Sequence, residues 1–561
     1  MSKIYLIEIA IGPVQDFIAS ARKLCDLWFG SYVLSELSKA TAQNLAINGC
    51  ELIFPAVDKS EIAVDLKPNS ELIVANKILA SYQGEKDPRQ LVADAKSVWR
   101  KKLNKMAEDT LSYIRKDHDL ELKEDLFRAQ IDDIGEFFGV WTSLDQSGYA
   151  KARDRVEQLL AGRKNLREFN APSWSGAGLP KNSLDGLRES ALKNSGEIQG
   201  LLKLNEQLDA MGCVKRFYPL TQKMLNVQFD DLAQIAIRPW LKAVENQGLK
   251  KPEWPSGKPL SGEEFFDEAN LDLLRALIKK PEIGPLTKYA CLLLGDGDKM
   301  GAAIGEISTP EGHKRFSKVL SKFANDARSI IEEHEGSLVY AGGDDVLAYV
   351  PLHTALSCGN SLRRQFKNLM AGVCRELGLR SDVPTFSIGM SIVHYQEPLS
   401  SALNTVRKAE TIAKNKGGRN ALALIQDKRS GSPIVAVGKW DTDEGLPGIA
   451  ERLSNWIELY RKQDDVSGFS ARLGYQLREA SRESGDEMKF EIQQDRLVPQ
   501  NAAAAFVLRI FHQKEAFRSM EKAKLHEWEV KLFRGYKSIR QLADELVIAH
   551  QFAILPVYGK E

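Results

Sequence analysis

The sequence predicts an α+β protein that contains a ferredoxin-like palm in its second half and a helical domain at its carboxyl end. Three observations lead to this fold class. Residues 289–425 read as β-α-β-β-α-β followed by one further helix and strand, which is the ferredoxin-like order extended by one unit. A Gly-Gly-Asp-Asp turn joins the two middle strands. Beyond about residue 431 the apolar periodicity becomes helical.

The first strand of this unit, residues 290–294, is apolar and is expected to end at Asp296. The helix over 311–335 places apolar residues at helical spacing, namely Phe316, Val319, Leu320, Phe323, Ala327, Ile330 and Ile331. The remaining predicted elements are a hairpin at 338–350, a helix at 354–377, a strand at 385–395, a helix at 398–416 and a strand at 421–425.

The hairpin carries two carboxylates at its tip. Gly342 and Gly343 permit the backbone to reverse tightly, which leaves Asp344 and Asp345 at the exposed end. Two adjacent acids repel each other unless a cation lies between them, so a divalent metal is the expected partner. If the strand ending at Asp296 lies beside this hairpin, Asp296 and Asp344 face each other and hold one or two Mg²⁺ ions, as two-metal nucleotidyl transfer requires. The alternative is that each cluster is a solvated turn.

A cationic turn follows the helix at 398–416. Lys414, Lys416 and Arg419 surround the glycines of Lys-Asn-Lys-Gly-Gly-Arg-Asn, and such cations suit a triphosphate. The alternative is that they are helix C-terminal cations, favoured by the helix dipole, beside the capping Gly417.

The block 289–425 resembles the cyclase and polymerase palm of the large subunit of type III CRISPR effector complexes. The start of the chain, Ile-Gly-Pro-Val-Gln-Asp-Phe-Ile-Ala-Ser-Ala-Arg-Lys at 11–23 and its continuation to Ser35, is similar to the first palm of that subunit in its Cmr branch. The resemblance therefore implies two ferredoxin-like palms. Diguanylate cyclases share the Gly-Gly-Asp-Asp outline but usually continue Glu-Phe, where this chain has Asp345 and Val346.

Carried over by position, the resemblance implies metal ligation by Asp296 and Asp344, with a third ligand from the Gly297 carbonyl and an acidic pair completed by Asp345. Lys414 and Arg419 would contact phosphates. The spacing from Lys414 to Arg419 is one residue longer than in diguanylate cyclases, which leaves open whether Lys414 or Lys416 binds. The region around Ser31 is expected to line the nucleotide pocket where the palms meet.

Two features of many relatives are not expected here. The chain starts directly at the first palm, and only His118 precedes His313, so no histidine-aspartate nuclease domain and no DNA cleavage are expected. His118-Asp119 lies in a charged run and is interpreted as solvated surface. The six cysteines are isolated, so no zinc ribbon is expected.

Composition is that of a large soluble protein. The formal net charge of +1 argues against a protein that grips nucleic acid over its whole surface, so RNA contacts must be local or come from partners. Isolated cysteines indicate a reducing compartment. The N-terminal strand is too short for a membrane span and is interrupted by Glu8. These observations predict a cytoplasmic protein without a membrane partner.

Four regions are expected. They are a first palm with insertions at 1–215, a helical connector at 216–285, the second palm at 286–430 and a helical domain at 431–561. A long loop is predicted at 173–180 and a proline-rich segment at 251–255. The resemblance makes the last region a docking surface for the small helical subunit and RNA backbone.

The resemblance implies a subunit of an RNA-guided antiviral complex that makes a cyclic oligoadenylate from ATP, with two Mg²⁺ or Mn²⁺ ions, when target RNA is bound. Expected partners are the other Cmr-type subunits, among them repeat-associated RNA-binding subunits, together with CRISPR RNA and target RNA. Three alternatives remain: joining AMP to S-adenosylmethionine at the same site, a non-catalytic RNA-binding scaffold, and a stand-alone diguanylate cyclase.

Overall fold

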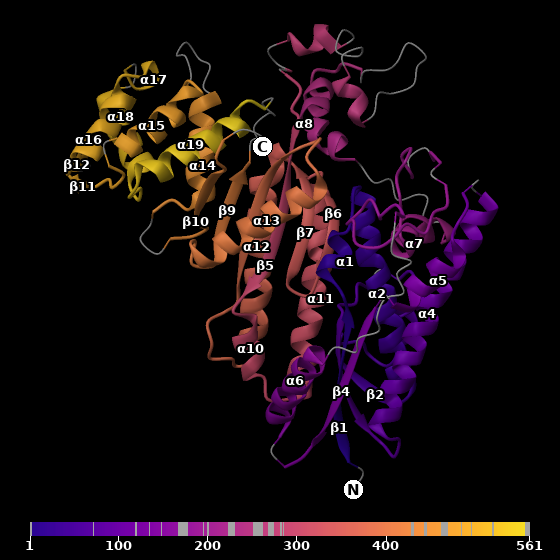
Figure 1. The fold of residues 1–561 in the computed structure, drawn as a ribbon. Coiled ribbons are helices and arrows are strands. Elements are labelled where there is room, and N and C mark those ends of the chain that lie inside the picture. Colours follow the sequence, from indigo (N-terminus) through magenta and orange to yellow (C-terminus); the bar gives the residue numbers. More distant parts are fainter. Residues whose placement is uncertain are drawn as a thin grey trace.

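In the residues that it describes, the computed structural model of the chain has two large β-sheets, each with helices packed on it, and a C-terminal group of helices that includes a small two-stranded sheet (Figure 1). It describes residues 3–555 except 71, 118–119, 134, 147, 167–177, 195, 199–200, 223–230, 251–261, 268–273, 281–282, 284, 428–430, 443–445, 462–468, 484, 495 and 519–520. Residues 173–177 of the loop predicted at 173–180, the segment 251–255 and the dipeptide His118-Asp119 lie outside the described residues.

The first sheet has the strand order β2-β3-β1-β4 and is antiparallel throughout, which is the ferredoxin-like arrangement. Its strands are β1 Ile4–Gly12, β2 Cys50–Phe54, β3 Lys77–Gln83 and β4 Glu136–Leu144. The helices around it are α1 Gln15–Ala19, α2 Leu24–Ile47, α3 Ile62–Asp65, α4 Pro88–Asp117, α5 Glu124–Asp133, α6 Tyr149–Asn165 and α7 Ala210–Thr221. Ile7 and Ile9 of β1 pack toward α2 and α4, whereas Leu6 and Ala10 pack toward α6 on the opposite face.

The second sheet has the order β10-β9-β8-β5-β7-β6, so its β8-β5-β7-β6 part repeats the ferredoxin-like order. The strands are β5 Tyr289–Asp298, β6 Ser337–Gly342, β7 Asp345–Pro351, β8 Thr385–His394, β9 Ala421–Gln426 and β10 Ile434–Lys439. The helices are α10 Met300–Glu306, α11 Pro310–Glu333, α12 Ala355–Glu376 and α13 Leu399–Asn415. Helices α11 and α12 share a core with one face of β5 and β7, and α13 packs on the other.

These bounds confirm the predicted order of elements over 289–425. Two details differ from the sequence expectation. The strand expected to end at Asp296 continues to Asp298, because β8 pairs with it as far as Thr385. The sheet also gains β10, which pairs with β9 beyond the boundary expected at residue 430.

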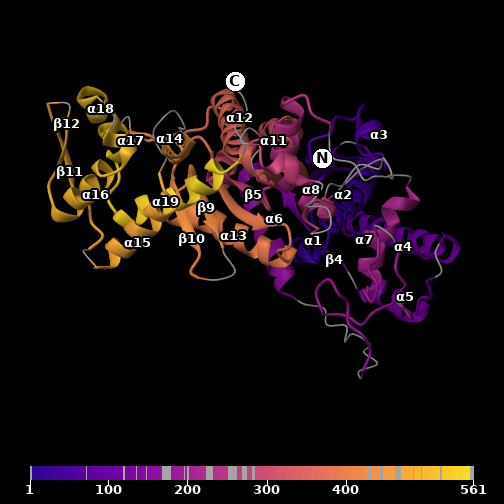
Figure 2. The ribbon, with the colours of Figure 1, turned by 90° about the horizontal axis from the view of Figure 1, so that it is seen from above.

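The two palms share a buried interface. Ala21 and Leu27 of the first palm pack with Val339 and Leu347 of the second. On another side, the Ala56 N–H donates to Ser317 Oγ of α11 at 3.1 Å. Figure 2 shows the second palm lying between the first palm and the C-terminal helices.

Two contacts from α6 add to this interface. Tyr149 Oη lies 2.6 Å from Nδ1 of His313 in α11. Arg153 donates to the carbonyl of Ile304 at 2.7 Å, at the end of α10. The first palm therefore contacts β6, β7, α10 and α11 of the second palm.

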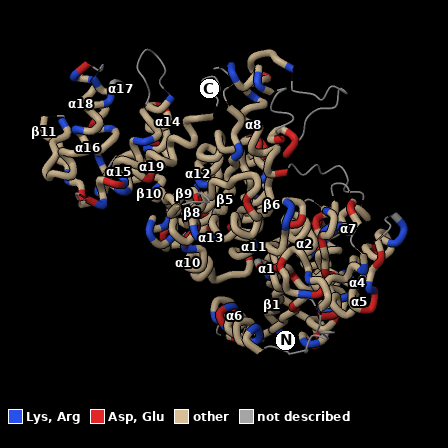
Figure 3. The backbone as a smooth tube through the Cα atoms, turned by 45° about the horizontal axis from the view of Figure 1, so that its top comes forward, with Lys and Arg blue, Asp and Glu red and all other residues tan. Residues whose placement is uncertain are grey.

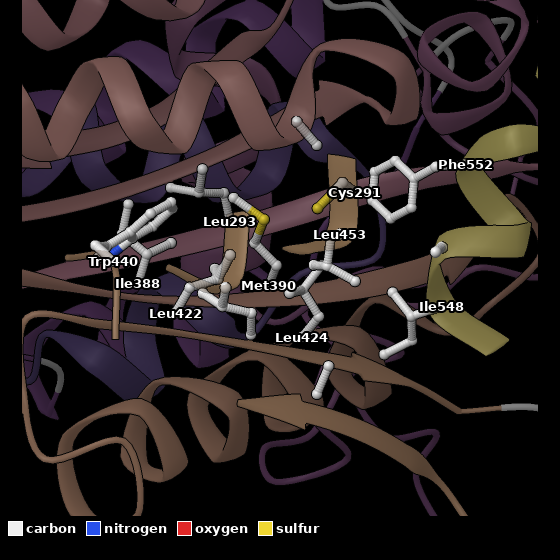
Figure 4. Close-up of a cluster of buried hydrophobic side chains, with 14 of the residues drawn as sticks. Cys291, Leu293, Ile388, Met390, Leu422, Leu424, Trp440, Leu453, Ile548 and Phe552 are labelled. Atoms are coloured by element: carbon white, nitrogen blue, oxygen red, sulfur yellow. The ribbon is translucent and has the colours of Figure 1, made fainter. Parts of the chain in front are cut away.

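The connector contains α8 Leu232–Asn246 and a short 3-10 turn at Gly262–Phe266. The C-terminal region consists of α14 Ile449–Arg461, α15 Arg472–Glu483, β11 Phe490–Gln493, β12 Arg496–Pro499, α16 Ala502–His512, α17 Glu515–Arg518, α18 Lys522–Phe533 and α19 Ile539–Ala553. Its helices pack onto the second palm, since Leu453 of α14 and Phe552 of α19 lie beside Cys291, Met390 and Leu424 of the sheet (Figure 4).

Lysine, arginine and acidic residues are interspersed along the described chain (Figure 3), in keeping with its near-zero net charge. All six cysteines are free, and five of them are buried. No described helix combines the length and the apolar character that crossing a bilayer needs.

Candidate active site

The Gly-Gly-Asp-Asp turn joins β6 to β7 as predicted. Gly343 has φ of +65°, a left-handed conformation that side chains rarely adopt, and this allows the reversal. Asp344 follows in the turn and Asp345 is the first residue of β7. The two carboxylates are therefore consecutive at one end of the sheet.

Both carboxyl groups of the turn are held in an environment that disfavours their charge. Burial, and then the neighbouring Asp345, raises the pKa of Asp344 to about 7. Burial raises the pKa of Asp345 to about 6. A pair of half-buried acids at one turn gains most from a bound cation, because a cation removes their mutual repulsion.

The end of β5 lies directly beside this turn. Gly295 of β5 pairs with Val346 of β7, and one further step in this antiparallel register sets Asp296 opposite Asp345. A Cβ atom on Gly297 would lie 2.8 Å from Asp344 Oδ2, so the Asp344 side chain packs over the Gly297 backbone. The register therefore sets Asp296 of β5 beside Asp345 of β7, and the Gly297 backbone lies against the Asp344 side chain.

Helix α13 contributes a cation to the same place. Lys414 Nζ forms an ion pair with Asp296 Oδ2 and another, at 2.7 Å, with Glu410 Oε1 one turn earlier. Burial, and then Asp345, raises the pKa of Glu410. Sequence analysis missed Glu410, although an acid four residues before Lys414 on a helix is a recognisable pattern.

The tight packing of α13 on the sheet explains why its side chains reach the strand ends. A Cβ atom on Gly389 of β8 would lie only 2.2 Å from the backbone nitrogen of Glu410. Gly389 pairs with Leu294 of β5. The helix axis is therefore close to the sheet at the level of the carboxylates.

Asp298 is a second residue that sequence analysis did not assign. It is 1 % exposed and accepts hydrogen bonds from Thr385 Oγ1 at 2.9 Å, from Ser387 Oγ and from the Asn420 N–H at 2.9 Å. Arg419 Nε lies 4.0 Å from it. Asp298 therefore ties the end of β5 to the turn that carries Arg419. Its place in Gly-Asp-Gly-Asp was the available signal.

The other residues that the sequence predicted for the site have fewer contacts with the carboxylates. Lys416 is exposed at the end of α13, and Arg419 is half exposed, with φ of +63°. Ser31 is buried in α2, the helix that contains Leu27 of the palm interface, but no contact joins its hydroxyl to the carboxylates among the described residues. Gly342 is the last residue of β6.

A small cavity of about 20 Å³ lies where the two palms meet at the turn. It is lined by Phe54 and Leu72 of the first palm and by Ala324, Asn325 and Gly343 of the second. The acidic turn therefore borders the first palm.

The donor set suits a hard divalent cation, since carboxylate and carbonyl oxygens are the ligands that Mg²⁺ prefers. The half-buried Asp344 and Asp345, whose charge is disfavoured, fit this role. Within the described residues no three His, Cys, Asp or Glu side chains are already grouped as a metal site. Asp296 is paired with the Lys414 ammonium group.

Comparison with known proteins finds two matching family models. Residues 288–423 match the Cas10/Cmr2 second palm domain, and residues 6–108 match the N-terminal region of the CRISPR-associated protein Cmr2. The chain is 27% identical over 566 residues to the CRISPR system Cmr subunit Cmr2 of Pyrococcus furiosus, an alignment that includes 78% of this chain and 63% of that protein. The chain thus spans less than two thirds of the length of this curated relative.

Solved structures share the fold. A solved structure of type III-B Cmr-beta in the apo state has a TM-score of 0.67 at 13% identity, and the match covers 98% of this chain and 82% of the chain in that structure. The structure of type III-B Cmr-beta bound to cognate target RNA has a TM-score of 0.66 at 13% identity, with 98% and 83% covered. The Gly-Gly-Asp-Asp turn lies inside the segment that matches the second palm domain. Two separate parts of the chain are thus similar to domains of the Cas10/Cmr2 large subunit, and the alignment with Cmr2 agrees with both matches.

Proposed function

We propose that the chain is a metal-dependent nucleotidyltransferase that makes a cyclic oligoadenylate from ATP inside an RNA-guided type III-B complex. The observation that carries this proposal is the convergence of Asp296, Gly297 and the Gly-Gly-Asp-Asp turn within a matched Cas10/Cmr2 palm. Three carboxylates at adjacent strand ends, with Lys414 beside them, form a set suited to a nucleotide triphosphate and its cations.

In this proposal Asp296, Asp344, Asp345 and the Gly297 carbonyl would hold two Mg²⁺ or Mn²⁺ ions. Such ions lower the pKa of an attacking hydroxyl and neutralise the leaving phosphate oxygens. Lys414 and Arg419 would contact the triphosphate, Lys414 as a point charge and Arg419 through its planar fork. Between the two lysines left open by spacing, the ion pair with Asp296 favours Lys414 over the exposed Lys416.

The acceptor would approach from the first palm. Its ribose 3′-hydroxyl attacks the α-phosphorus of the ATP held at the turn, a P–O bond forms, and the bond to pyrophosphate breaks. The border between Gly343 and the first palm supports this direction of approach. Ser31 remains a proposed pocket residue on α2, and Gly342 and Gly343 remain the proposed backbone of the turn.

Partners are part of the proposal. Other Cmr-type subunits, CRISPR RNA and target RNA would bind the chain and activate synthesis, with the helices beyond residue 449 as the docking surface for the small helical subunit. The relative solved with cognate target RNA shares the fold of 98% of the chain, which supports an RNA-bound assembly.

The test is to incubate the assembled complex with labelled ATP, Mg²⁺ and target RNA, and to compare it with Asp344→Ala/Asp345→Ala. The double variant should form no product above background, because the turn then has no carboxylates. Equal product from both complexes would rule out the proposal. Adding S-adenosylmethionine and weighing the product distinguishes an adenylate ring from AMP joined to that acceptor.

A further inference from the structure

The ammonium group of Lys414 lies between two carboxylates. Its ammonium group pairs with Asp296 Oδ2 on the sheet and with Glu410 Oε1 at 2.7 Å on its own helix. Lys414 and Asp296 are both about one quarter exposed, at 26% and 25%, so the pair is only partly screened by solvent. The carboxylate that the proposed function gives to a metal ion is therefore already paired with an internal cation.

Glu410 fixes where this cation lies. The backbone of α13 is pressed onto β8 at Gly389, and Ala409 and Ala413 on the same helix are buried. A four-residue separation places Glu410 and Lys414 on one face of α13, so the carboxylate is a fixed anchor for the long lysine side chain. Without Glu410, the ammonium group would lose its helix-side partner and keep only Asp296.

A metal ion and an ammonium group at the same carboxylate repel each other, because both are cations. Replacement of Lys414 by a divalent ion therefore requires the lysine to leave Asp296, and the nearby phosphates of a nucleotide are the anions that would receive it. The half-buried pair Asp344 and Asp345 remains beside the vacated position.

We propose that Glu410 is a positioning residue that holds Lys414 on Asp296, so that Lys414 is an internal counter-ion which competes with the divalent metal until a nucleotide draws it away. This inference rests on the proposed function and deepens it, because it makes metal binding at Asp296 depend on nucleotide binding. Lys414 then weakens metal binding in the absence of ATP and strengthens ATP binding in the presence of metal.

The experiment measures Mn²⁺ binding to the full chain without nucleotide, from the paramagnetic resonance signal of free Mn²⁺, with the binding of Asp344→Ala/Asp345→Ala subtracted. Lys414→Gln should bind Mn²⁺ roughly twofold to fivefold more tightly than the unaltered chain, since a partly exposed ion pair is worth at most about 1 kcal/mol, which is about fivefold in affinity. Lys408→Gln, an exposed lysine of the same helix, is the matched control and should leave the affinity unchanged.

The charge-balanced variant Glu410→Gln/Lys414→Gln separates direct competition from long-range repulsion. It has the same net charge as the unaltered chain but leaves Asp296 without its cation, so its Mn²⁺ affinity should also rise. A double variant that binds Mn²⁺ no more tightly than the unaltered chain would overturn the inference, because charge alone would then explain Lys414→Gln.

The KM for ATP is a second readout: the variant that binds Mn²⁺ more tightly should bind ATP less well. In the assembled complex, Lys414→Gln should raise the KM for ATP, and Glu410→Asp, which keeps the carboxylate, should restore more of the behaviour of the unaltered chain than Glu410→Gln. If the unaltered complex makes product while both Lys414 variants bind Mn²⁺ normally, only the inference fails. If no product forms and no Mn²⁺ binds above the subtracted background, the proposed function fails with it.

Discussion

The two palms of this chain have the same strand order but different strand ends. In the first, β1 ends at Gly12 and is followed by proline and valine, and the connection between β2 and β3 is about twenty residues long. In the second, β5 ends in Gly-Asp-Gly-Asp and the β6–β7 connection is a two-residue turn carrying Asp344. The ferredoxin-like fold therefore positions the strand ends, whereas the residues at those ends decide whether a palm can support catalysis.

The first prediction concerns the packing of the acidic turn on β5 and has the largest expected effect. Gly297→Ala would set a Cβ atom 2.9 Å from the Asp344 Cβ and displace the carboxylate. In the assay with labelled ATP, Mg²⁺ and target RNA, the rate of product formation should fall on the order of 100-fold, because a shift of about 1 Å at a reacting centre has that cost.

The control for this variant is Gly301→Ala in α10, where nothing lies within 4 Å of the added atom. It should keep its activity, since alanine is the better helix former. Thermal unfolding of both variants would confirm that they are folded. If Gly297→Ala forms product from ATP at the normal rate, the position of Asp344 is not the feature that makes the second palm, and not the first, suited to catalysis.

The second prediction compares one buried acid from the first strand of each palm. Asp298→Ala leaves Thr385, Ser387 and the Asn420 N–H without their acceptor and should reduce the free energy of unfolding by about 3 kcal/mol. Glu8 is 1 % exposed, and its main partner is the half-exposed Lys77 at 2.7 Å.

Glu8→Gln should therefore cost less than about 1 kcal/mol, because burial already raises the pKa of this carboxyl and Lys77 can be solvated. Urea unfolding of the two variants at pH 7 gives the comparison. Equal losses would mean that Asp298 has no special role in organising the end of β5.

The third prediction tests the interface between the palms through pH. Burial, and then Arg153, lowers the pKa of His313 to about 4, while an unfolded histidine titrates near 6.5. Between these values the unfolded state binds more protons than the folded state, so this contribution is present above about pH 6.5 and is lost as pH falls toward 4.

His313→Gln removes this titration while keeping a polar partner for Tyr149. The loss of stability between pH 7 and pH 5 should be smaller in the variant by about 2 kcal/mol. The measurement is the unfolding midpoint at both pH values. An identical pH dependence would show that His313 is not buried in a neutral form at the interface.

The fourth prediction concerns a surface contact between the palms and has the smallest effect. Lys318 of α11 pairs with Asp58 of the first palm at 2.6 Å, but the side chains are 40% and 56% exposed. Lys318→Gln should change the unfolding free energy by at most about 0.5 kcal/mol, because exposed ion pairs are weak. A loss above 2 kcal/mol would show that charges, rather than the shared apolar core around Leu27 and Val339, hold the palms together.

The order of elements over 289–425 could be predicted because it depends on local patterns. Apolar spacing marked α11 and the β6–β7 hairpin, and the two glycines marked the turn. The same local reading placed Asp296, Asp344 and Asp345 at strand ends. It placed the end of β5 two residues early, since the pairing of Asp298 with Thr385 is a contact between distant segments.

Glu410 and Asp298 were not predicted, and the reason is physical. Glu410 acquires its role only because α13 packs closely over Gly389, and Asp298 only because its acceptor atoms meet donors from β8 and from the turn at Asn420. The four-residue spacing of Glu410 and Lys414 and the Gly-Asp-Gly-Asp segment are visible in the sequence, but the partners that give Glu410 and Asp298 their roles lie in distant segments.

Local sequence is enough to place two carboxylates on a glycine turn between apolar strands, since turn geometry and side-chain alternation act over a few residues. The folded chain was needed to show that Asp296 is paired with Lys414, that Asp344 packs over Gly297 and that the turn borders the first palm. These facts depend on which strands and helices pack together, and that is set by burial of apolar surface between segments far apart in the chain.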